Sequence, residues 1–270
     1  IRRPPRSTLS SSSAASDVYK RQIDDTLTDN GSLRASAYSA IEALDNAGIG
    51  VVPITGRPAG WCDLIARFWP VRGVVGENGA FYFRYQRQET RMERFYADSK
   101  SQRQEKQKKL AELATKIIEQ VPSCAVSADQ SYRETDLAID FAEDIPRLDD
   151  KKIQHIVTLF EEAGATAKVS SIHVNGWFGK YDKLSMAKCF AAQCLNLDLD
   201  KEGSMSIFIG DSPNDAPMFE SFEHSVGVAN IRAFESQLKT PPRYVTHGHG
   251  GVGFVEFSEL LINARGGSEV

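Results

Sequence analysis

The chain has 270 residues, 41% of them hydrophobic, with a formal net charge of −4 and a pI near 5.8. This length can bury one large core or two smaller ones. The acidic balance argues against nucleic acid or an anionic membrane as the main partner, and no apolar run approaches the roughly 18 residues of a membrane span. Four scattered cysteines without a CxxC pattern indicate free thiols in a reducing compartment, so we expect a cytoplasmic protein.

Residues 1–22 differ from the rest of the chain. They contain five basic residues against one acidic residue, six serines and no apolar periodicity. The part from Ser12 to Gln22 resembles translated library-adaptor sequence. We therefore predict that residues 1–22 are non-native or disordered and leave them out of the expected fold. A basic disordered tail is the alternative interpretation.

From residue 23 onward, helical and strand patterns alternate. Apolar spacing predicts a helix over 33–44, a strand over 49–54, a helix over 58–68 and a short strand at 74–75. The rhythm resumes with a helix from 183 and a strand over 206–210. This order predicts an α/β fold with a doubly wound, mostly parallel sheet, which is a Rossmann-like core.

Between 82 and 178 the pattern changes. We predict a strand pair at 81–85 and 92–96, helices over 102–120 and 153–160, and alternating, half-buried strands at 137–141 and 169–174. Helices combined with antiparallel strands indicate an α+β module. The predicted organisation is thus a core of 23–81 and 179–270 with an inserted α+β cap domain over 82–178.

The predicted strand at 206–210 leads directly into an acidic motif. Asp211 follows it immediately, and Asn214 and Asp215 come within the next four residues. Ligands of open α/β sheets bind at the carboxyl ends of strands, and oxygen ligands of this kind suit Mg²⁺. A capped turn with solvated acids is the alternative for this motif taken alone.

Four segments together resemble the motifs of the haloacid dehalogenase-like phosphatases in order and spacing: Asp24-Asp25-Thr26-Leu27-Thr28, Ile54-Thr55-Gly56-Arg57, Lys183 and Gly210-Asp211-Ser212-Pro213-Asn214-Asp215. Glu77-Asn78-Gly79-Ala80 resembles the turn that leads into the large α/β cap of one subgroup. This subgroup contains the sucrose-phosphate, mannosyl-phosphoglycerate and Cof-type phosphatases. The resemblance implies a Mg²⁺-dependent phosphoric monoester hydrolase that acts on a small phosphorylated sugar or sugar acid through an aspartyl-phosphate.

The resemblance also implies a role for each matching residue. Asp24 would be the general acid and base and a metal ligand, Thr55 and Lys183 would bind the phosphoryl group, and the metal would be held by Asp211, Asn214 and Asp215. Substrate contacts are expected from Gly56, Arg57, Asn78, His173 and Asn175. Arg57 could instead be the partner of a nearby acid. The sequence predicts a monomer or small homo-oligomer that binds a small metabolite.

One position departs from the family pattern. The pattern Asp-x-Asp-x-Thr places its nucleophilic Asp two residues before Asp24, where this chain has Gln22. An amide cannot form an aspartyl-phosphate, so we expect this chain to be nearly inactive. Replacement of the native first strand together with its nucleophile is one explanation. Two other functions remain open: a phosphosugar-binding protein without turnover and a phosphosugar mutase.

Overall fold

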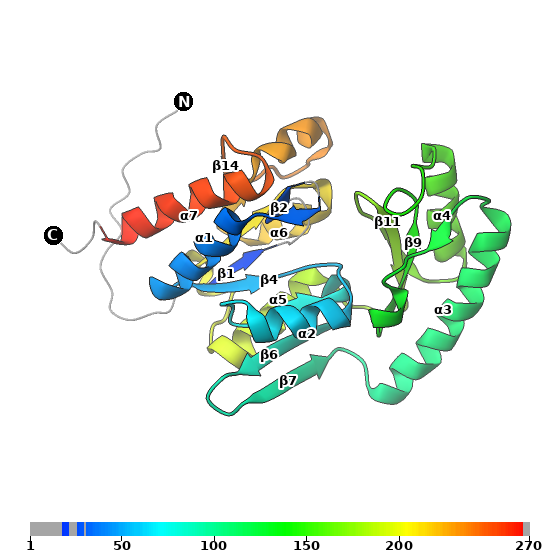
Figure 1. The fold of residues 1–270 in the computed structure, drawn as a ribbon, viewed down its shortest axis with the longest axis horizontal. Coiled ribbons are helices and arrows are strands. Elements are labelled where there is room, and N and C mark those ends of the chain that lie inside the picture. Colours follow the sequence, from blue (N-terminus) through cyan, green and yellow to red (C-terminus); the bar gives the residue numbers. More distant parts are fainter. Residues whose placement is uncertain (1–17, 22–25, 30, 267–270) are drawn as a thin grey trace.

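The computed structural model describes residues 18–21, 26–29 and 31–266. Figure 1 shows a large part at the left, which we call the core, and a smaller part at the right, which we call the cap. The main core sheet has the strand order β14-β13-β12-β1-β4, and all its neighbouring strands are parallel. Its strands are β1 (Val18–Arg21), β4 (Gly50–Pro53), β12 (Ser206–Gly210), β13 (His224–Gly227) and β14 (Tyr244–Val245).

An antiparallel extension continues this sheet beyond β4. A parallel bridge between Ile54 and Val75 joins β4 to β5 (Val74–Gly76), which pairs with β6 (Phe81–Gln86), which pairs with β7 (Arg91–Tyr96). A short hairpin of β2 (Thr28–Asp29) and β3 (Ser32–Leu33) lies before the first helix. The predicted α/β fold with a mostly parallel sheet is confirmed.

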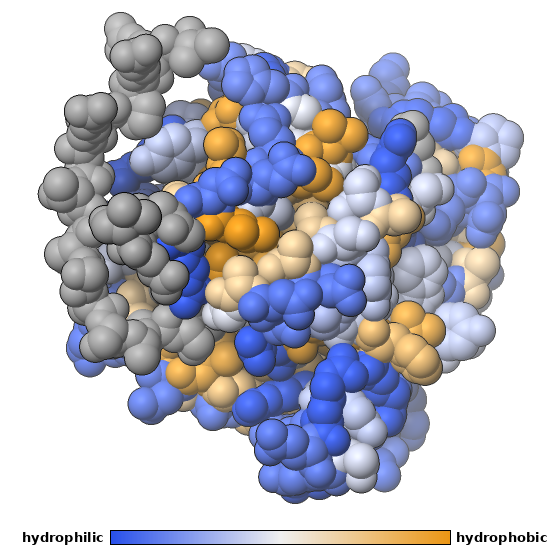
Figure 2. All heavy atoms as spheres, turned by 60° about the vertical axis from the view of Figure 1, so that its left-hand side comes forward, coloured by the Kyte–Doolittle hydropathy of each residue, from blue (hydrophilic) through white to orange (hydrophobic). Residues whose placement is uncertain are grey.

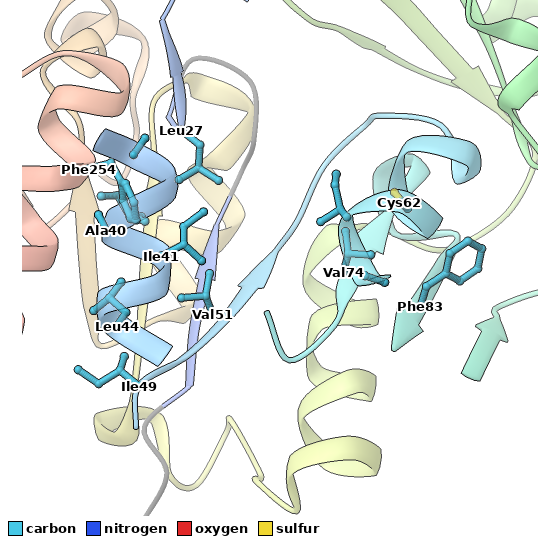
Figure 3. Close-up of a cluster of buried hydrophobic side chains, with 14 of the residues drawn as sticks. Leu27, Ala40, Ile41, Leu44, Ile49, Val51, Cys62, Val74, Phe83 and Phe254 are labelled. Carbon is cyan, nitrogen blue, oxygen red and sulfur yellow. The ribbon is translucent and has the colours of Figure 1, made fainter. Parts of the chain in front are cut away.

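Helices cover both faces of the core sheet because successive residues of a strand point to opposite faces. Val51 of β4 packs with one hydrophobic cluster and Val52 with the other. The first cluster contains residues of α1 (Ala35–Asn46), α2 (Ala59–Phe68) and α7 (Gly250–Gly266). The second contains residues of α5 (Lys183–Leu195) and α6 (Ala216–Ser221). Figure 3 shows part of the first cluster, with Ile41 and Leu44 of α1 lying against Val51.

The cap is a four-stranded antiparallel sheet with two helices on one face. The sheet has the order β10-β11-β9-β8, formed by β8 (Ala125–Val126), β9 (Asp136–Asp140), β10 (Thr166–Val169) and β11 (His173–Trp177). Leu137, Ile139 and Val174 pack with α3 (Lys100–Gln120) and α4 (Asp150–Glu162) in a separate hydrophobic cluster. The cap helices lie on the side away from the core in Figure 1, so the other face of the cap sheet is turned toward the core.

Two predicted boundaries differ from the structure. We left residues 1–22 out of the expected fold. In the structure, Val18–Arg21 of this segment form β1, which lies between β4 and β12. Its backbone can pair on both sides because ladder hydrogen bonds require no particular side chains. We also began the cap at 82, but Tyr82, Phe83 and Phe95 of the β6–β7 hairpin pack in the core clusters. The division between core and cap therefore falls near Ser99, the N-cap of α3.

Two predicted cap strands were also wrong in detail. The alternating pattern over 169–174 spans two strands, β10 and β11, joined by a turn. The strand near 137–141 is β9, and it is buried on both faces rather than half-buried. Its polar positions Asp136 and Asp140 are buried against other parts of the protein instead of facing solvent. The alternation of polar and apolar residues correctly indicated a strand, but it could not show which part of the protein covers the polar face of that strand.

The surface carries apolar residues in separate patches. Figure 2 shows one face that is hydrophilic over most of its area, with smaller apolar regions between. Three large exposed side chains, Trp61, Leu64 and Phe68, come from α2. Among the helices that the structure describes, none combines the length and the apolar character needed to cross a membrane.

Candidate active site

The candidate site lies where the carboxyl ends of β4, β5 and β12 meet the cap sheet. A cavity of about 1400 Å³ separates core and cap there and is lined by residues of both. Eight of the predicted site residues line it: Gly56, Arg57, Asn78, His173, Asn175, Lys183, Asp211 and Asn214. Thr55 and Asp215 are fully buried next to it. Asp24 and Gln22 lie outside the described residues.

Asp211 is held in place by the segment that carries the first motif. Thr26, which is fully buried, donates a hydrogen bond from Oγ1 to Asp211 Oδ1 at 2.6 Å. β1 pairs Arg21 with Ile209, so it ends one residue before Gly210 at the same edge of the sheet. The first and fourth motifs, whose residues Thr26 and Asp211 are 185 positions apart, therefore meet at this edge. Parallel strands bring their carboxyl ends together in this way.

Asp215 lies directly behind Asp211. Its Oδ2 accepts hydrogen bonds from the backbone N–H groups of Asp211 at 3.1 Å and Ser212 at 3.4 Å. Its Oδ1 lies 3.8 Å from Lys183 Nζ and has no hydrogen-bond partner among the described residues. Burial raises the pKa of Asp215, and Lys183 opposes this shift. Asp215 thus orients the loop that carries Asp211 and keeps one carboxylate oxygen available.

The oxygen atoms of this loop are compatible with a hard cation. Asp211 and Asp215 supply carboxylates, and the Asn214 side chain, which lines the cavity, supplies an amide oxygen. The part of the chain that the structure describes contains no cluster of three or more His, Cys, Asp or Glu side chains that could hold a metal ion. Asp24 is not in that part, so the described donors are only some of the predicted set. These donors fit Mg²⁺, which prefers oxygen ligands.

The Thr55-Gly56 turn is shaped by close contacts. Thr55 Oγ1 accepts a hydrogen bond from the backbone N–H of Arg57 at 3.0 Å, which leaves its hydroxyl proton available as a donor. A Cβ atom on Gly56 would lie 3.1 Å from side-chain atoms of both Asn78 and Asn175. Glycine at this position therefore lets a core turn and a cap strand approach each other. Arg57 lies 3.5 Å from Glu143 of the cap, so it has an acidic partner.

The turn after β5 has an unusual backbone conformation. Glu77 and Asn78 both have positive φ, 41° and 57°, and Gly79 has φ 102°. A Cβ on Gly79 would come within 2.0 Å of the Asp182 carbonyl oxygen, so only glycine allows this turn to pack against the start of α5. The turn directs the Glu77 carboxylate into the protein, where it is fully buried.

Glu77 binds backbone groups of both parts. It accepts hydrogen bonds from the N–H groups of Ala59 at 2.8 Å, Glu134 at 2.9 Å and Thr135 at 2.6 Å, and from the Thr135 hydroxyl. Burial and the nearby Asp136 raise the pKa of Glu77 to about 7, against the effect of these donors. The sequence indicates a turn at Glu77 but no role for its carboxylate. The only sign of such a role in the sequence was an acidic residue between a predicted strand and the dipeptide Asn78-Gly79.

Arg133 completes this junction from the cap side. Its guanidinium donates to Gly56 O at 3.0 Å and to both Asp136 and Asp129. Burial would lower the pKa of Arg133, but the two carboxylates outweigh it and raise the pKa. Arg133 lines the cavity, so it belongs to the site. Its position depends on the fold of the cap, and no motif marks it.

The cap contributes a row of polar side chains from β11. His173, Asn175 and Trp177 are two residues apart, so they lie on one face of the strand, the face opposite Val174. All three are buried and line the cavity. His173 Nε2 lies 2.8 Å from Glu143, while burial lowers the pKa of His173. Within the described residues, Asn175 Oδ1 and Trp177 Nε1 have no hydrogen-bond partner.

Comparisons with known proteins agree with this architecture. A family model described as haloacid dehalogenase-like hydrolase matches residues 151–234, which include Lys183 and the loop of Asp211. Comparison of the sequence with curated proteins finds no match. The predicted resemblance to this family is confirmed over residues 151–234, and solved structures similar to this chain share the predicted fold with its cap.

Three solved structures illustrate the shared fold. The protein 0175 from Thermoplasma acidophilum has a TM-score of 0.69 at 19% identity, covering 92% of this chain and 98% of that chain. The sucrose-phosphatase from Synechocystis sp. PCC6803, solved with sucrose and phosphate, has a TM-score of 0.63 at 13% identity, covering 93% and 99%. A subclass IIB sugar phosphatase of the haloacid dehalogenase superfamily has a TM-score of 0.62 at 14% identity, covering 91% and 97%. At such identities the likeness establishes the fold alone.

Proposed function

We propose that this protein is built as a Mg²⁺-dependent phosphatase for a small phosphorylated sugar or sugar acid. One observation carries the proposal: a single cavity combines Asp211 and Lys183 at the edge of the core sheet with the polar row of the cap sheet. The core side supplies groups for a phosphoryl group, and the cap side supplies groups for the remainder of a metabolite. A cavity between two domains suits a small molecule rather than a protein substrate.

The polar atoms without partners support a polyhydroxylated ligand. Buried polar groups in proteins are almost always hydrogen-bonded, and an unpaired one costs free energy. Asn175 Oδ1 requires a donor and Trp177 Nε1 requires an acceptor. A sugar hydroxyl can serve as either after a small movement of these side chains, because both atoms are buried. The names of two similar structures, a sucrose-phosphatase and a sugar phosphatase, support the same substrate class.

The side chains have separate tasks in this proposal. Lys183, at the first residue of α5, would neutralise the phosphoryl oxygens, and the Thr55 hydroxyl would donate a hydrogen bond to them. Asp24 would protonate the leaving oxygen and later accept a proton from water. Asp211, Asn214 and Asp215 would hold Mg²⁺ together with Asp24, and the bound ion would offset the charge on the phosphoryl group. Arg133 and Asn78 would position the substrate under the cap.

Gln22 limits what this chain can do as it stands. The covalent route requires a carboxylate at this position, and an amide is a poor nucleophile and a weaker ligand for Mg²⁺. We therefore expect binding without appreciable turnover. A phosphosugar-binding protein is the second candidate function, and Gln22 itself favours it.

Restoring the carboxylate tests the proposal. Gln22→Asp should rescue the Mg²⁺-dependent release of phosphate from a panel of hexose phosphates only in part, because the covalent route becomes available while Lys20 and Arg21 still occupy the central strand β1. Gln22→Asn is the matched control, since it has the size of Asp without the charge and should stay inactive. A second variant combines Gln22→Asp with the replacement of residues 17–21 by an apolar β-branched strand, which suits the central position of β1 better.

The outcome separates the two candidate functions. If the doubly changed protein is folded, binds Mg²⁺ and still releases no phosphate, the phosphatase function is wrong. Binding of a hexose phosphate by that same protein would then support a binding protein.

A further inference from the structure

Within the phosphosugar site proposed above, on which this step rests, we infer that the ligand carries a second anionic group, a carboxylate or a further phosphate. Arg147 and Lys168 of the cap would bind it. The cavity and the chain as a whole differ sharply in charge. The chain has a net charge of −4, whereas the described residues that line the cavity include seven basic and only two acidic side chains.

Pairing divides these basic residues into two groups. Three have carboxylate partners: Arg57 with Glu143, Arg133 with Asp129 and Asp136, and Lys183 with Asp215. The other four, Arg147, Lys168, Lys180 and Arg232, have no ion-pair partner within the described residues. The two acidic side chains of the lining both make hydrogen bonds within the protein. Asp182 caps α5, and Asp211 accepts a hydrogen bond from Thr26.

The strand register places Lys168 beside the polar row. Lys168 pairs with Asn175 across the β10–β11 ladder, and directly paired residues project from the same face of a sheet. Lys168 and Asn175 both line the cavity, in agreement with this geometry. The ammonium group therefore extends from the cap face that also presents the groups proposed to bind sugar hydroxyls.

Arg147 lies in the loop between β9 and α4 and also lines the cavity. Its guanidinium carbon lies 5.3 Å from the centre of the Phe141 ring. Phe141 in turn donates its backbone N–H to Ile172, the residue before His173. Arg147 and Lys168 thus both belong to the cap side of the cavity, whereas Lys183 and Asp211 belong to the core edge. A ligand with anions at its two ends would satisfy both sides.

The remaining two cations have other positions. Lys180 precedes Lys183 by three residues in the segment that returns to the core, and Arg232 lies on the core 3-10 helix η5 (Ala229–Gln237). The core side alone can bind a single phosphoryl group and balance its charge of about −2. A neutral sugar would leave the two cap cations without a counter-charge. Cations around a cavity also attract anionic ligands from solution.

Calorimetric titration of matched ligand pairs tests the inference on the chain as it stands, because Gln22 should prevent turnover. Glucose 6-phosphate is compared with 6-phosphogluconate, which adds a carboxylate, and fructose 6-phosphate with fructose 1,6-bisphosphate, which adds a phosphate. Two exposed charge pairs should make at least one of the doubly anionic ligands bind about tenfold more tightly than its partner. The pair that shows the preference identifies the source of the second anion.

Two variants locate the preference. Lys168→Gln and Arg147→Gln should each reduce the affinity ratio by about threefold, with little effect on glucose 6-phosphate. Lys151→Gln, on an exposed face of α4 outside the cavity, should leave the ratio unchanged. Equal affinities within both ligand pairs, or a ratio that neither cap variant changes, would overturn the inference while the phosphosugar site stands. If none of the four ligands binds, the proposed function fails as well.

Discussion

Two of the contacts between the cap and the core have opposite character. At the junction, which comprises Glu77 of the core with Arg133 and Thr135 of the cap, the contacts are buried, charged and numerous. At the rim, Asn214 of the core donates one hydrogen bond of 2.6 Å to the Val169 carbonyl oxygen, and Asn214 is exposed. Breaking a buried charged contact costs far more free energy than breaking an exposed neutral one. We therefore expect the cap to be anchored at the junction and to separate first at the rim.

The largest effect should come from removing the carboxylate of the junction. Glu77→Ala would leave the N–H groups of Ala59, Glu134 and Thr135 buried without their acceptor, at a cost of about 1–3 kcal/mol for each group. Because the site can relax, we expect a total loss of about 4 kcal/mol in the free energy of unfolding, measured with urea. A loss below about 1 kcal/mol would show that the junction is not the anchor.

A second prediction concerns the pH dependence of stability. Burial and Asp136 raise the pKa of Glu77 from 4.5 to about 7, so the folded protein holds a proton that the unfolded chain releases. The stabilisation is fully present below about pH 4.5 and is lost as the pH rises toward 7, by on the order of 2–3 kcal/mol. Glu77→Gln cannot titrate. The difference in unfolding free energy between this variant and the unchanged protein should therefore vary with pH across this window.

Urea unfolding of both proteins at several pH values between 4.5 and 8 measures this difference. Other buried acids, such as Asp136 and Asp215, titrate in both proteins, and the subtraction reduces their contribution. A difference that stays constant with pH would mean that Glu77 is ionised throughout. Its hydrogen-bond donors would then outweigh its burial.

The sequence predicted features that depend on short segments, but not the contacts between core and cap at the junction and the rim. Local patterns were sufficient for several elements of the core: the helix with Ile41 and Leu44 and the strand before Asp211 are both present. The motif residues Lys183 and Asp211 line the cavity, as their position at the edge of a parallel sheet implies. These features depend on periodicity and on the direction of strands, which are properties of short segments.

Arg133, by contrast, could not be assigned from its neighbours. It acts on Gly56, 77 residues earlier in the chain, and its burial depends on how the cap packs on the core. The same holds for the contact of Asn214 with Val169, which are 45 residues apart. Asp136 alternates with apolar residues, a pattern typical of a solvent-facing strand edge, yet it is buried by Arg133. Contacts between domains leave no periodic signal in either segment.

The smallest effect should come from the rim. Asn214→Ala removes the one hydrogen bond to Val169, and an exposed neutral bond contributes about 0.5–1.5 kcal/mol at most. Global stability should therefore change by less than about 1 kcal/mol. The local effect should be clearer: amide hydrogen exchange in β10 should accelerate by about two- to tenfold, because the rim opens more often.

Asn214→Asp provides the second variant for this test, since it keeps a side-chain oxygen near the loop of Asp211, loses the N–H donor and adds a negative charge. If the hydrogen bond from Asn214 to Val169 holds the rim closed, both variants should accelerate exchange in β10. Exchange of the amides of Glu134 and Thr135 at the junction should stay unchanged. If exchange in β10 is unaffected in both variants, the rim contact does not hold the cap. Accelerated exchange at the junction as well would mean that core and cap separate in one step, and the distinction between anchor and rim would be lost.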